Sequence, residues 1–202
     1  MRGRRGLAAA GLVLVSGVAF ADTPPASPLT EIRRTVDAVL AVVNDTALQA
    51  PGRESARREA VLRVIEPRFD FSETARLALG RYWRARTDAE RRQFVALFSR
   101  LLERAYVERI LAYSGESVQY LGQTTGVDHA TVRTRIATQR DTDIPVDYRL
   151  LRQGDRWLVY DVRIDGLSLV ENYREQFNDV IVSSSYGNLV KKMEARLRDG
   201  NG

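Results

Sequence analysis

Residues 157–177 read WLVYDVRIDGLSLVENYREQF, and this stretch decides how the chain folds. Apolar side chains at Leu158, Tyr160, Val162 and Ile164 recur at every second position, which is the period of a strand with one strongly apolar face. A Gly at position 166 relieves the backbone, and a Ser at position 168 offers a helix N-cap oxygen. Apolar residues then follow at helical spacing, at Val170, Tyr173, Phe177 and Ile181. The stretch therefore predicts a strand, a tight turn and a helix.

Helical patterns occupy the chain before this strand and after it. Ser27 followed by Pro28 is typical of a helix start, because Ser caps the helix and Pro suits its first position. Thr87 and Glu90 have the spacing of a capping box, which opens the strongest apolar stripe of the chain. We expect helices from 28 to about 44, over 54–65, from about 69 to 80, from 87 to about 113, and from 168 to about 197 with a pause at 183–185.

Between residues 117 and 164 the pattern changes to alternation. Four strands are expected, around 118–120, 132–136, 146–150 and 158–164, with short connections rich in Gly, Asp and Thr at 122–128, 139–143 and 153–155. Short connections imply an antiparallel meander, and a sheet with one apolar face must be covered by helices. The sequence therefore predicts a single α+β domain.

The first residues have the pattern of a targeting segment. Arg2, Arg4 and Arg5 precede an apolar run over 6–18, and Ala19-Phe20-Ala21 fits a small-x-small cleavage site. We expect a cleaved signal peptide at 1–21, a leader at 22–28, the domain at 29–198 and a tail at 199–202. An uncleaved anchor is the alternative, which the short run disfavours. No Cys follows the run, so a lipoprotein anchor is excluded.

Composition narrows the classes of function. The chain has 31 basic and 26 acidic side chains, and removal of the three signal-peptide arginines leaves 28 basic against 26 acidic. The high isoelectric point therefore comes largely from the signal peptide, and a nucleic-acid-binding function loses its main support. The chain has no cysteine, which rules out a Cys nucleophile and any thiolate metal site.

The sequence contains no pattern that assembles a catalytic site. His129 is the only histidine, and a lone histidine seldom forms a catalytic dyad or a metal site. Ser184 lacks the Gly-x-Ser-x-Gly elbow of serine hydrolases. Asp161 is compatible with a pocket acid, but a structural role in bonding backbone amides or an arginine is favoured. We expect no enzyme activity, no metal and no cofactor.

Arginines cluster before the longest expected helix. Arg81 and Arg84 flank Tyr82, and a guanidinium is a planar fork suited to phosphate. The cluster is a candidate for contact with a lipid head group or a protein partner. A solvated surface face is the simpler interpretation.

The 157–177 stretch closely resembles the MlaC, or toluene-tolerance (Ttg2-type), family of periplasmic phospholipid carriers, whose members carry a strand ending in Tyr-Asp followed by a Gly-hydrophobic-Ser-hydrophobic helix start. The Phe69-Asp70-Phe71 and 78–83 blocks are also similar. The resemblance extends over residues 32–197. It implies a helix-and-sheet fold with a deep hydrophobic cavity for the acyl tails of a glycerophospholipid, which would be the only bound group.

The resemblance also implies a location and partners. It implies a monomeric shuttle in the periplasm, between an inner-membrane ABC-type transporter complex and an outer-membrane lipoprotein-porin complex, that helps to keep the outer membrane asymmetric. From the apolar faces we expect the cavity walls to come from one strand face, the helix after residue 168 and the longest helix. These residues are Phe98, Leu101, Val132, Ile136, Val146, Tyr148, Leu150, Tyr160, Val162, Leu169, Val170, Tyr173 and Phe177.

Two other classes of function remain open at this point. A periplasmic adaptor domain with a filled core would show the same apolar stripes and bind only protein. A lipid hydrolase would have an activity that depends on Asp161, His129 or Ser184. Co-purifying phospholipid would separate a carrier from both.

Overall fold

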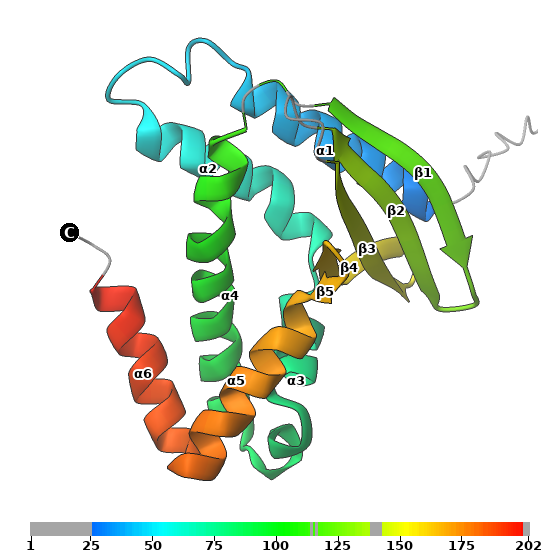
Figure 1. Cartoon of the computed structure of the whole chain (residues 1–202). Helices are drawn as coiled ribbons and strands as arrows, with labels where there is room; N and C mark the ends of the chain where they lie inside the picture. Colours follow the sequence, from blue (N-terminus) through cyan, green and yellow to red (C-terminus); the bar gives the residue numbers. More distant parts are fainter. Residues whose placement is uncertain (1–25, 114, 116, 138–142, 200–202) are drawn as a thin grey trace, which may run out of the picture.

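The computed structural model describes residues 26–113, 115, 117–137 and 143–199. The predicted signal peptide, residues 22–25 of the leader, residues 200–202 of the tail and most of the 139–143 connection lie outside these ranges. Figure 1 shows helices, then a sheet, then helices along the chain. The helices are α1 (Pro28–Val43), α2 (Glu54–Ile65), η1 (Glu66–Arg68), α3 (Phe71–Leu79), η2 (Gly80–Ala85), α4 (Asp88–Leu111), α5 (Leu169–Ser183) and α6 (Tyr186–Arg198).

The sheet is an antiparallel meander, which confirms the α+β class. Its strands lie in the order β1-β2-β3-β4-β5, so each strand pairs with its neighbour in the sequence. The fifth strand was not expected; it pairs Ser168 with Arg163 and continues directly into α5. The strands are β1 (Ser117–Thr125), β2 (His129–Ala137), β3 (Ile144–Gln153), β4 (Arg156–Ile164) and β5 (Leu167–Ser168).

The expected alternation of β4 is interrupted by a bulge. Arg149 of β3 pairs with Asp161 of β4, but Leu150 pairs with Val159, so Tyr160 is an extra residue without a partner on β3. A bulge of this kind shifts the alternation by one position. The prediction of one unbroken face from position 158 to 164 is therefore wrong, because Val159 joins Val162 on the same face.

The first strand is longer than its sequence pattern indicates. The prediction placed a connection at 122–128, whereas β1 runs to Thr125 and only residues 126–128 connect it to β2. The pairing with β2 is irregular between Tyr120 and Gly122, and Gly122 has φ of 121°. A glycine tolerates this conformation, and it allows the strand to continue past the irregularity.

The expected helix starts are confirmed. Thr87 and Glu90 form both bonds of the capping box at the start of α4. Ser27 accepts a hydrogen bond from the Thr30 backbone N–H at the start of α1. Such caps satisfy backbone N–H groups that have no partner within the helix. None of the helices in the described ranges is long and apolar enough to cross a bilayer.

Three buried apolar clusters hold these elements together. The first joins α3, α4, α5 and α6, with Phe177 in edge-to-face contact with Phe94 and Phe98 at ring-centroid distances of 5.5 and 5.2 Å. The second lies between α1 and the sheet, and the third joins α1, α2 and the C-terminal half of α4. In Figure 1, α4 runs from the α3–α5–α6 end of the molecule to α2. The space between the three clusters is not filled by side chains.

Candidate ligand-binding cavity

The junction of β4, β5 and α5 is fixed by a tight turn and a buried carboxylate. Asp165 has φ of 52° and Gly166 has φ of 78°, so both turn residues adopt left-handed backbone. Ser168 then caps α5 by accepting a hydrogen bond from Glu171 N at 3.0 Å. The turn therefore sets the angle at which α5 leaves the sheet.

Asp161 has the structural role that the sequence favours. Its side chain is 1% exposed. Its carboxylate accepts hydrogen bonds from Ser168 Oγ at 2.7 Å and from Val170 N at 3.1 Å, and Arg149 Nη1 lies 3.5 Å from it. A buried charge needs such partners, because an unpaired one is strongly destabilising. Asp161 thus ties the strand to the start of the helix.

A large apolar cavity lies between α1, α2, α4, the sheet and the start of α5. Its volume is about 540 Å³. Protein interiors are close-packed and hold few voids larger than a water molecule, so a cavity of this size is a candidate binding site. Ligand pockets span about 300–1,000 Å³ and are lined mostly by hydrophobic and aromatic side chains. Both features fit this cavity.

Eight of the thirteen expected wall residues line the cavity. They come from β2, β3, β4, α4 and the first turn of α5. The helix residues contribute because α4 presents one face to the sheet, and α5 begins directly beneath the turn. The eight are Phe98, Ile136, Val146, Tyr148, Tyr160, Val162, Leu169 and Val170.

The other five expected residues pack elsewhere. Val132 and Leu150 share the sheet face and the α1-side cluster of Val146 and Tyr148, but they are fully buried and do not line the cavity. Periodicity gives the face of a strand and not how far along that face a helix extends. The remaining three fill the cluster between α3 and α6. They are Leu101, Tyr173 and Phe177.

The sequence reasoning missed the wall formed by the N-terminal helices. Val36 and Leu40 of α1 line the cavity, together with Leu62 and Ile65 of α2. The apolar faces of these helices are visible in the sequence, but no local pattern shows that α1 and α2 pack opposite the sheet. Further lining residues on these and neighbouring elements are Val39, Val43, Phe69, Phe71, Leu102, Tyr106, Val107 and Ile110.

A few polar groups interrupt the apolar wall. Burial raises the pKa of Tyr148 to about 12, so its hydroxyl remains protonated at neutral pH. Burial also raises the pKa of the Glu103 carboxyl, and the neighbouring Glu66 adds to this shift. Glu103 and Arg109 are on α4, whereas the carboxylate of the third such lining residue, Asp161, accepts hydrogen bonds from Ser168 Oγ and Val170 N. The wall is therefore apolar with two charged groups on one helix.

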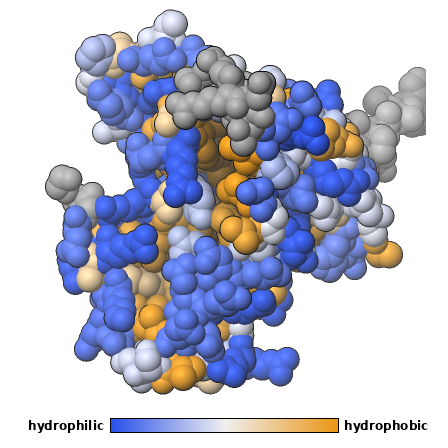
Figure 2. All heavy atoms as spheres, in the orientation of Figure 1, coloured by the Kyte–Doolittle hydropathy of each residue, from blue (hydrophilic) through white to orange (hydrophobic). Residues whose placement is uncertain are grey.

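The cavity opens near the C-terminal end of α4. Of its lining residues, only Arg109 and Ala112 are exposed; the others are buried or half-buried. Figure 2 shows a recess on the face of the molecule between α4 and the sheet, with hydrophobic residues inside it and hydrophilic residues around it. A ligand with an apolar body and a polar end fits this shape.

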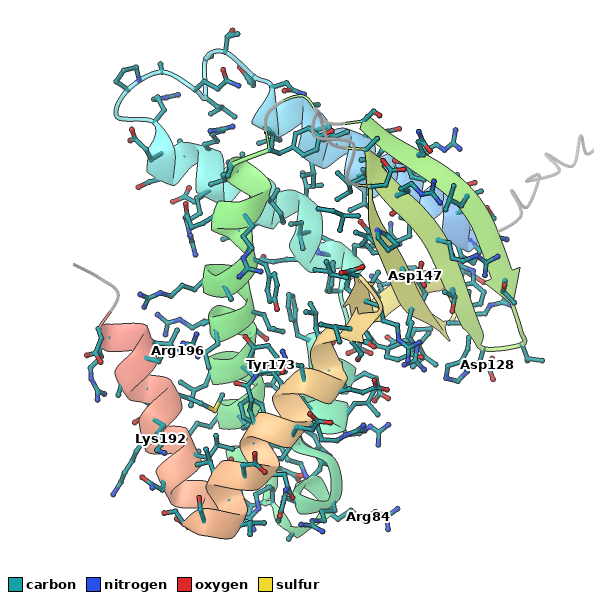
Figure 3. The ribbon with its side chains drawn as sticks, in the orientation of Figure 1. Arg84, Asp128, Asp147, Tyr173, Lys192 and Arg196 are labelled. Atoms are coloured by element: carbon teal, nitrogen blue, oxygen red, sulfur yellow. The ribbon has the colours of Figure 1, made fainter. Side chains whose placement is uncertain are left out.

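The arginine cluster singled out in the sequence lies away from the cavity lining. Arg81, Tyr82 and Arg84 belong to η2, at the opposite end of α4 from the exposed Arg109. Arg81 Nη2 and Tyr82 Oη both lie within hydrogen-bond distance of Asn178 Oδ1, at 2.8 and 3.0 Å. Figure 3 shows Arg84 at this end of the molecule. The structure does not bring the cluster together with the apolar walls.

A second, polar pocket of about 330 Å³ lies beside the apolar cavity and shares Tyr160, Asp161 and Val170 with it. His129 also lines this pocket, but Ser184 does not; it is the residue after α5 and accepts a hydrogen bond from Asn188. The three candidate hydrolase residues are thus not assembled. Within the part of the chain that the structure describes, no group of His, Asp or Glu could hold a metal ion.

The fold and the cavity together define a binding protein that encloses an apolar ligand beneath a helix-covered antiparallel sheet. Residues 33–195 match the family model described as "MlaC protein". The chain therefore belongs to the MlaC family, which confirms the resemblance carried by residues 157–177.

Individual relatives agree with this assignment. The chain is 22% identical over 186 residues to the intermembrane phospholipid transport system binding protein MlaC of Haemophilus influenzae, covering 90% of this chain and 86% of the relative. It is 23% identical over 180 residues to the toluene tolerance protein ttg2D of Pseudomonas putida, covering 88% and 82%.

A solved structure has the same fold. It is a phospholipid-binding protein from Ralstonia solanacearum in complex with a phospholipid. The TM-score is 0.78 at 29% sequence identity, and the match covers 86% of this chain and 98% of the other.

Proposed function

We propose that this protein is a soluble periplasmic carrier that encloses the acyl tails of a glycerophospholipid in the 540 Å³ cavity. The observation that carries the proposal is the cavity itself, open at one end and lined by apolar side chains from α1, α2, α4, α5 and the sheet. A similarly folded protein has been solved with a phospholipid bound, and a curated relative is named for intermembrane phospholipid transport.

The energetics of tail burial are sufficient for such a role. Each methylene removed from water contributes about 0.8 kcal/mol. About twenty buried methylenes thus contribute roughly 16 kcal/mol, which exceeds the cost of about 4–15 kcal/mol for lost translational and rotational freedom on association. The aqueous space between two membranes is a barrier to a diacyl lipid. A protein that covers the acyl tails removes this barrier. The function requires no catalytic group.

The proposal extends to location and partners. The signal peptide expected at 1–21 would deliver the chain to the periplasm. There it would receive or deliver lipid at an inner-membrane ABC-type transporter complex and an outer-membrane lipoprotein-porin complex, and so maintain outer-membrane lipid asymmetry. We assign contact with the acyl tails to the eight predicted residues that line the cavity and to the α1 and α2 side chains opposite them.

Solvent extraction of protein purified without detergent tests the proposal. Mass spectrometry of the extract is expected to show glycerophospholipid in near-stoichiometric amount, and native mass spectrometry the matching mass increase on the intact chain. Folded protein that carries no lipid, and that does not take up lipid from vesicles, would favour the adaptor class instead. A lipid that is released as its hydrolysis products would favour the hydrolase class.

A further inference from the structure

Two side chains at the rim of the cavity can donate hydrogen bonds. Tyr106 and Arg109 both belong to α4 and both line the cavity, with Arg109 exposed at its opening. The Arg109 guanidinium carbon lies 5.5 Å from the centroid of the Tyr106 ring. Among the residues that the structure describes, neither side chain has a hydrogen-bond or ion-pair partner.

Two further side chains that can donate hydrogen bonds are Tyr173 of α5 and Arg196 of α6. The ring of Tyr173 packs edge-on against Phe98 of α4, with 5.0 Å between ring centroids, and this holds its hydroxyl beside α4. The carbonyl of Arg196 accepts a hydrogen bond from Arg104 Nη1 at 2.7 Å, which anchors this turn of α6 to α4. Figure 3 shows Tyr173 between α4 and α5, and Arg196 where α6 faces α4.

The directions of the pKa shifts of the two tyrosines support this grouping. Burial raises the pKa of Tyr173, and the positive charges of Arg196 and Arg109 oppose that rise. Burial likewise raises the pKa of Tyr106, with Tyr173 adding to the shift and Arg109 opposing it. Both phenols therefore stay protonated at neutral pH and can donate.

No carboxylate takes part in this arrangement, as far as the described residues show. Glu103 also lines the cavity; burial and the charge of Glu66 raise its pKa, and Arg58 and Arg100 oppose the rise. A group of uncompensated donors on three helices, beside an apolar cavity, is suited to an anion with an apolar remainder.

We propose that Tyr106, Arg109, Tyr173 and Arg196 bind the phosphate group of the lipid whose tails fill the cavity. The inference rests on the proposed carrier function and places the head group between α4, α5 and α6, in place of the η2 cluster of Arg81, Tyr82 and Arg84. The guanidinium groups supply paired N–H donors, and the phenols supply O–H donors from the apolar side. These hydrogen bonds hold the phosphate, and the rest of the head group lies outside the cavity.

The test compares two lipids that differ in the phosphate alone. Delipidated protein is titrated with short-chain phosphatidic acid and with diacylglycerol of the same chain length, and affinities are measured by calorimetry. The variants are Arg109→Gln, Arg196→Gln and Tyr173→Phe. Arg84→Gln and Tyr82→Phe serve as controls from the η2 cluster, and Arg92→Gln is an exposed control on α4 itself. Inorganic phosphate alone is a third titrant.

Unmodified protein is expected to bind the phospholipid at least tenfold more tightly than diacylglycerol. Arg109→Gln and Arg196→Gln are each expected to lower phospholipid affinity about tenfold, and Tyr173→Phe about threefold, with diacylglycerol affinity unchanged and the controls like the parent. Equal affinity of the parent for the two lipids, or a loss in the η2 variants instead, would overturn the phosphate site and leave the carrier function intact. Binding of inorganic phosphate that depends on Arg109, without any preference for the phospholipid, would also overturn it. A parent that binds neither lipid would overturn both proposals.

Discussion

The hydroxyl of Ser168 donates to Asp161 Oδ2 at 2.7 Å while the same oxygen accepts from the backbone N–H of Glu171 at 3.0 Å. One small side chain therefore caps α5 and holds the carboxylate of β4. Asp161 also accepts from Val170 N at 3.1 Å. Two walls of the cavity, the strand and the first turn of the helix, are joined by these three bonds.

Removal of the carboxylate is expected to weaken this joint. Asp161→Ala leaves the Val170 N–H without an acceptor, and a buried unsatisfied group of this kind costs about 1–3 kcal/mol. Arg149 adds little, because about a third of its side chain is exposed. We expect urea unfolding to give a free energy of unfolding lower by about 2 kcal/mol.

Asp143→Ala is the matched control for this change. Its carboxylate pairs with Arg135 at the surface, where both side chains are over 40% exposed. Exposed pairs of this kind contribute about 0–1 kcal/mol. A similar loss of stability in the two variants would show that the strand–helix joint does not depend on Asp161.

The pKa of Tyr148 leads to a pH-dependent stability. Burial raises this pKa to about 12 in the folded protein, against about 10 in an unfolded chain. Between these values the unfolded chain has lost the phenolic proton and the folded protein retains it. The contribution is therefore fully present below pH 10 and is lost as the pH rises toward 12, at about 1.4 kcal/mol per pH unit.

Tyr148→Phe isolates this contribution from the other tyrosines. We expect its free energy of unfolding to fall less steeply with pH above 10 than that of the parent. Absorbance of tyrosinate near pH 12 should also lose one ionisation step in the folded variant. Identical slopes for parent and variant would show that Tyr148 titrates as an exposed phenol.

Removal of the bound lipid is expected to lower stability. A ligand that binds only the folded state stabilises it by about 2.7 kcal/mol at a concentration one hundred times its dissociation constant. Protein stripped by unfolding and refolding should melt at a lower temperature than protein as purified, and added phospholipid should restore the higher value. Equal melting curves before and after stripping would contradict a lipid-filled cavity.

The sequence predicts the fold well where a local pattern determines it. The capping box at Thr87 and the Asp-Gly-Leu-Ser turn of 165–168 act within a few residues, and both appear as expected. The bulge at Tyr160 is different, because an extra residue on β4 depends on pairing with β3. The pattern of β4 alone does not reveal the bulge. Residues 157–162 are all buried, so no exposed position marks the point where the alternation shifts.

No local sequence pattern predicts the depth of the cavity. Leu150 and Tyr148 lie two positions apart on the same face of β3 and both belong to the cluster that includes Ile32 of α1, yet only Tyr148 lines the cavity. This difference depends on where a helix lies that is more than a hundred residues away in the sequence. Residue patterns therefore predicted which faces are apolar, and the packing of α1 and α2 decides which parts of those faces meet a ligand.

Filling the cavity should displace lipid without unfolding the protein. Leu102 and Leu97 lie on α4, are both half-buried and both pack against the cluster between α3 and α6, but only Leu102 also lines the cavity. Leu102→Trp places an indole in space that is empty of protein atoms, so we expect near-parental stability. The amount of co-purified phospholipid should fall at least fivefold, because the indole occupies volume that the tails need.

Leu97→Trp is the control with the same change of side chain. Here the indole enters close-packed core, and overpacking of this kind costs about 1–3 kcal/mol. We expect this variant to lose stability in urea and to retain its lipid as purified. The two variants thus separate cavity volume from core packing on one helix. Full lipid content in a stably folded Leu102→Trp protein would place the tails elsewhere than in this cavity.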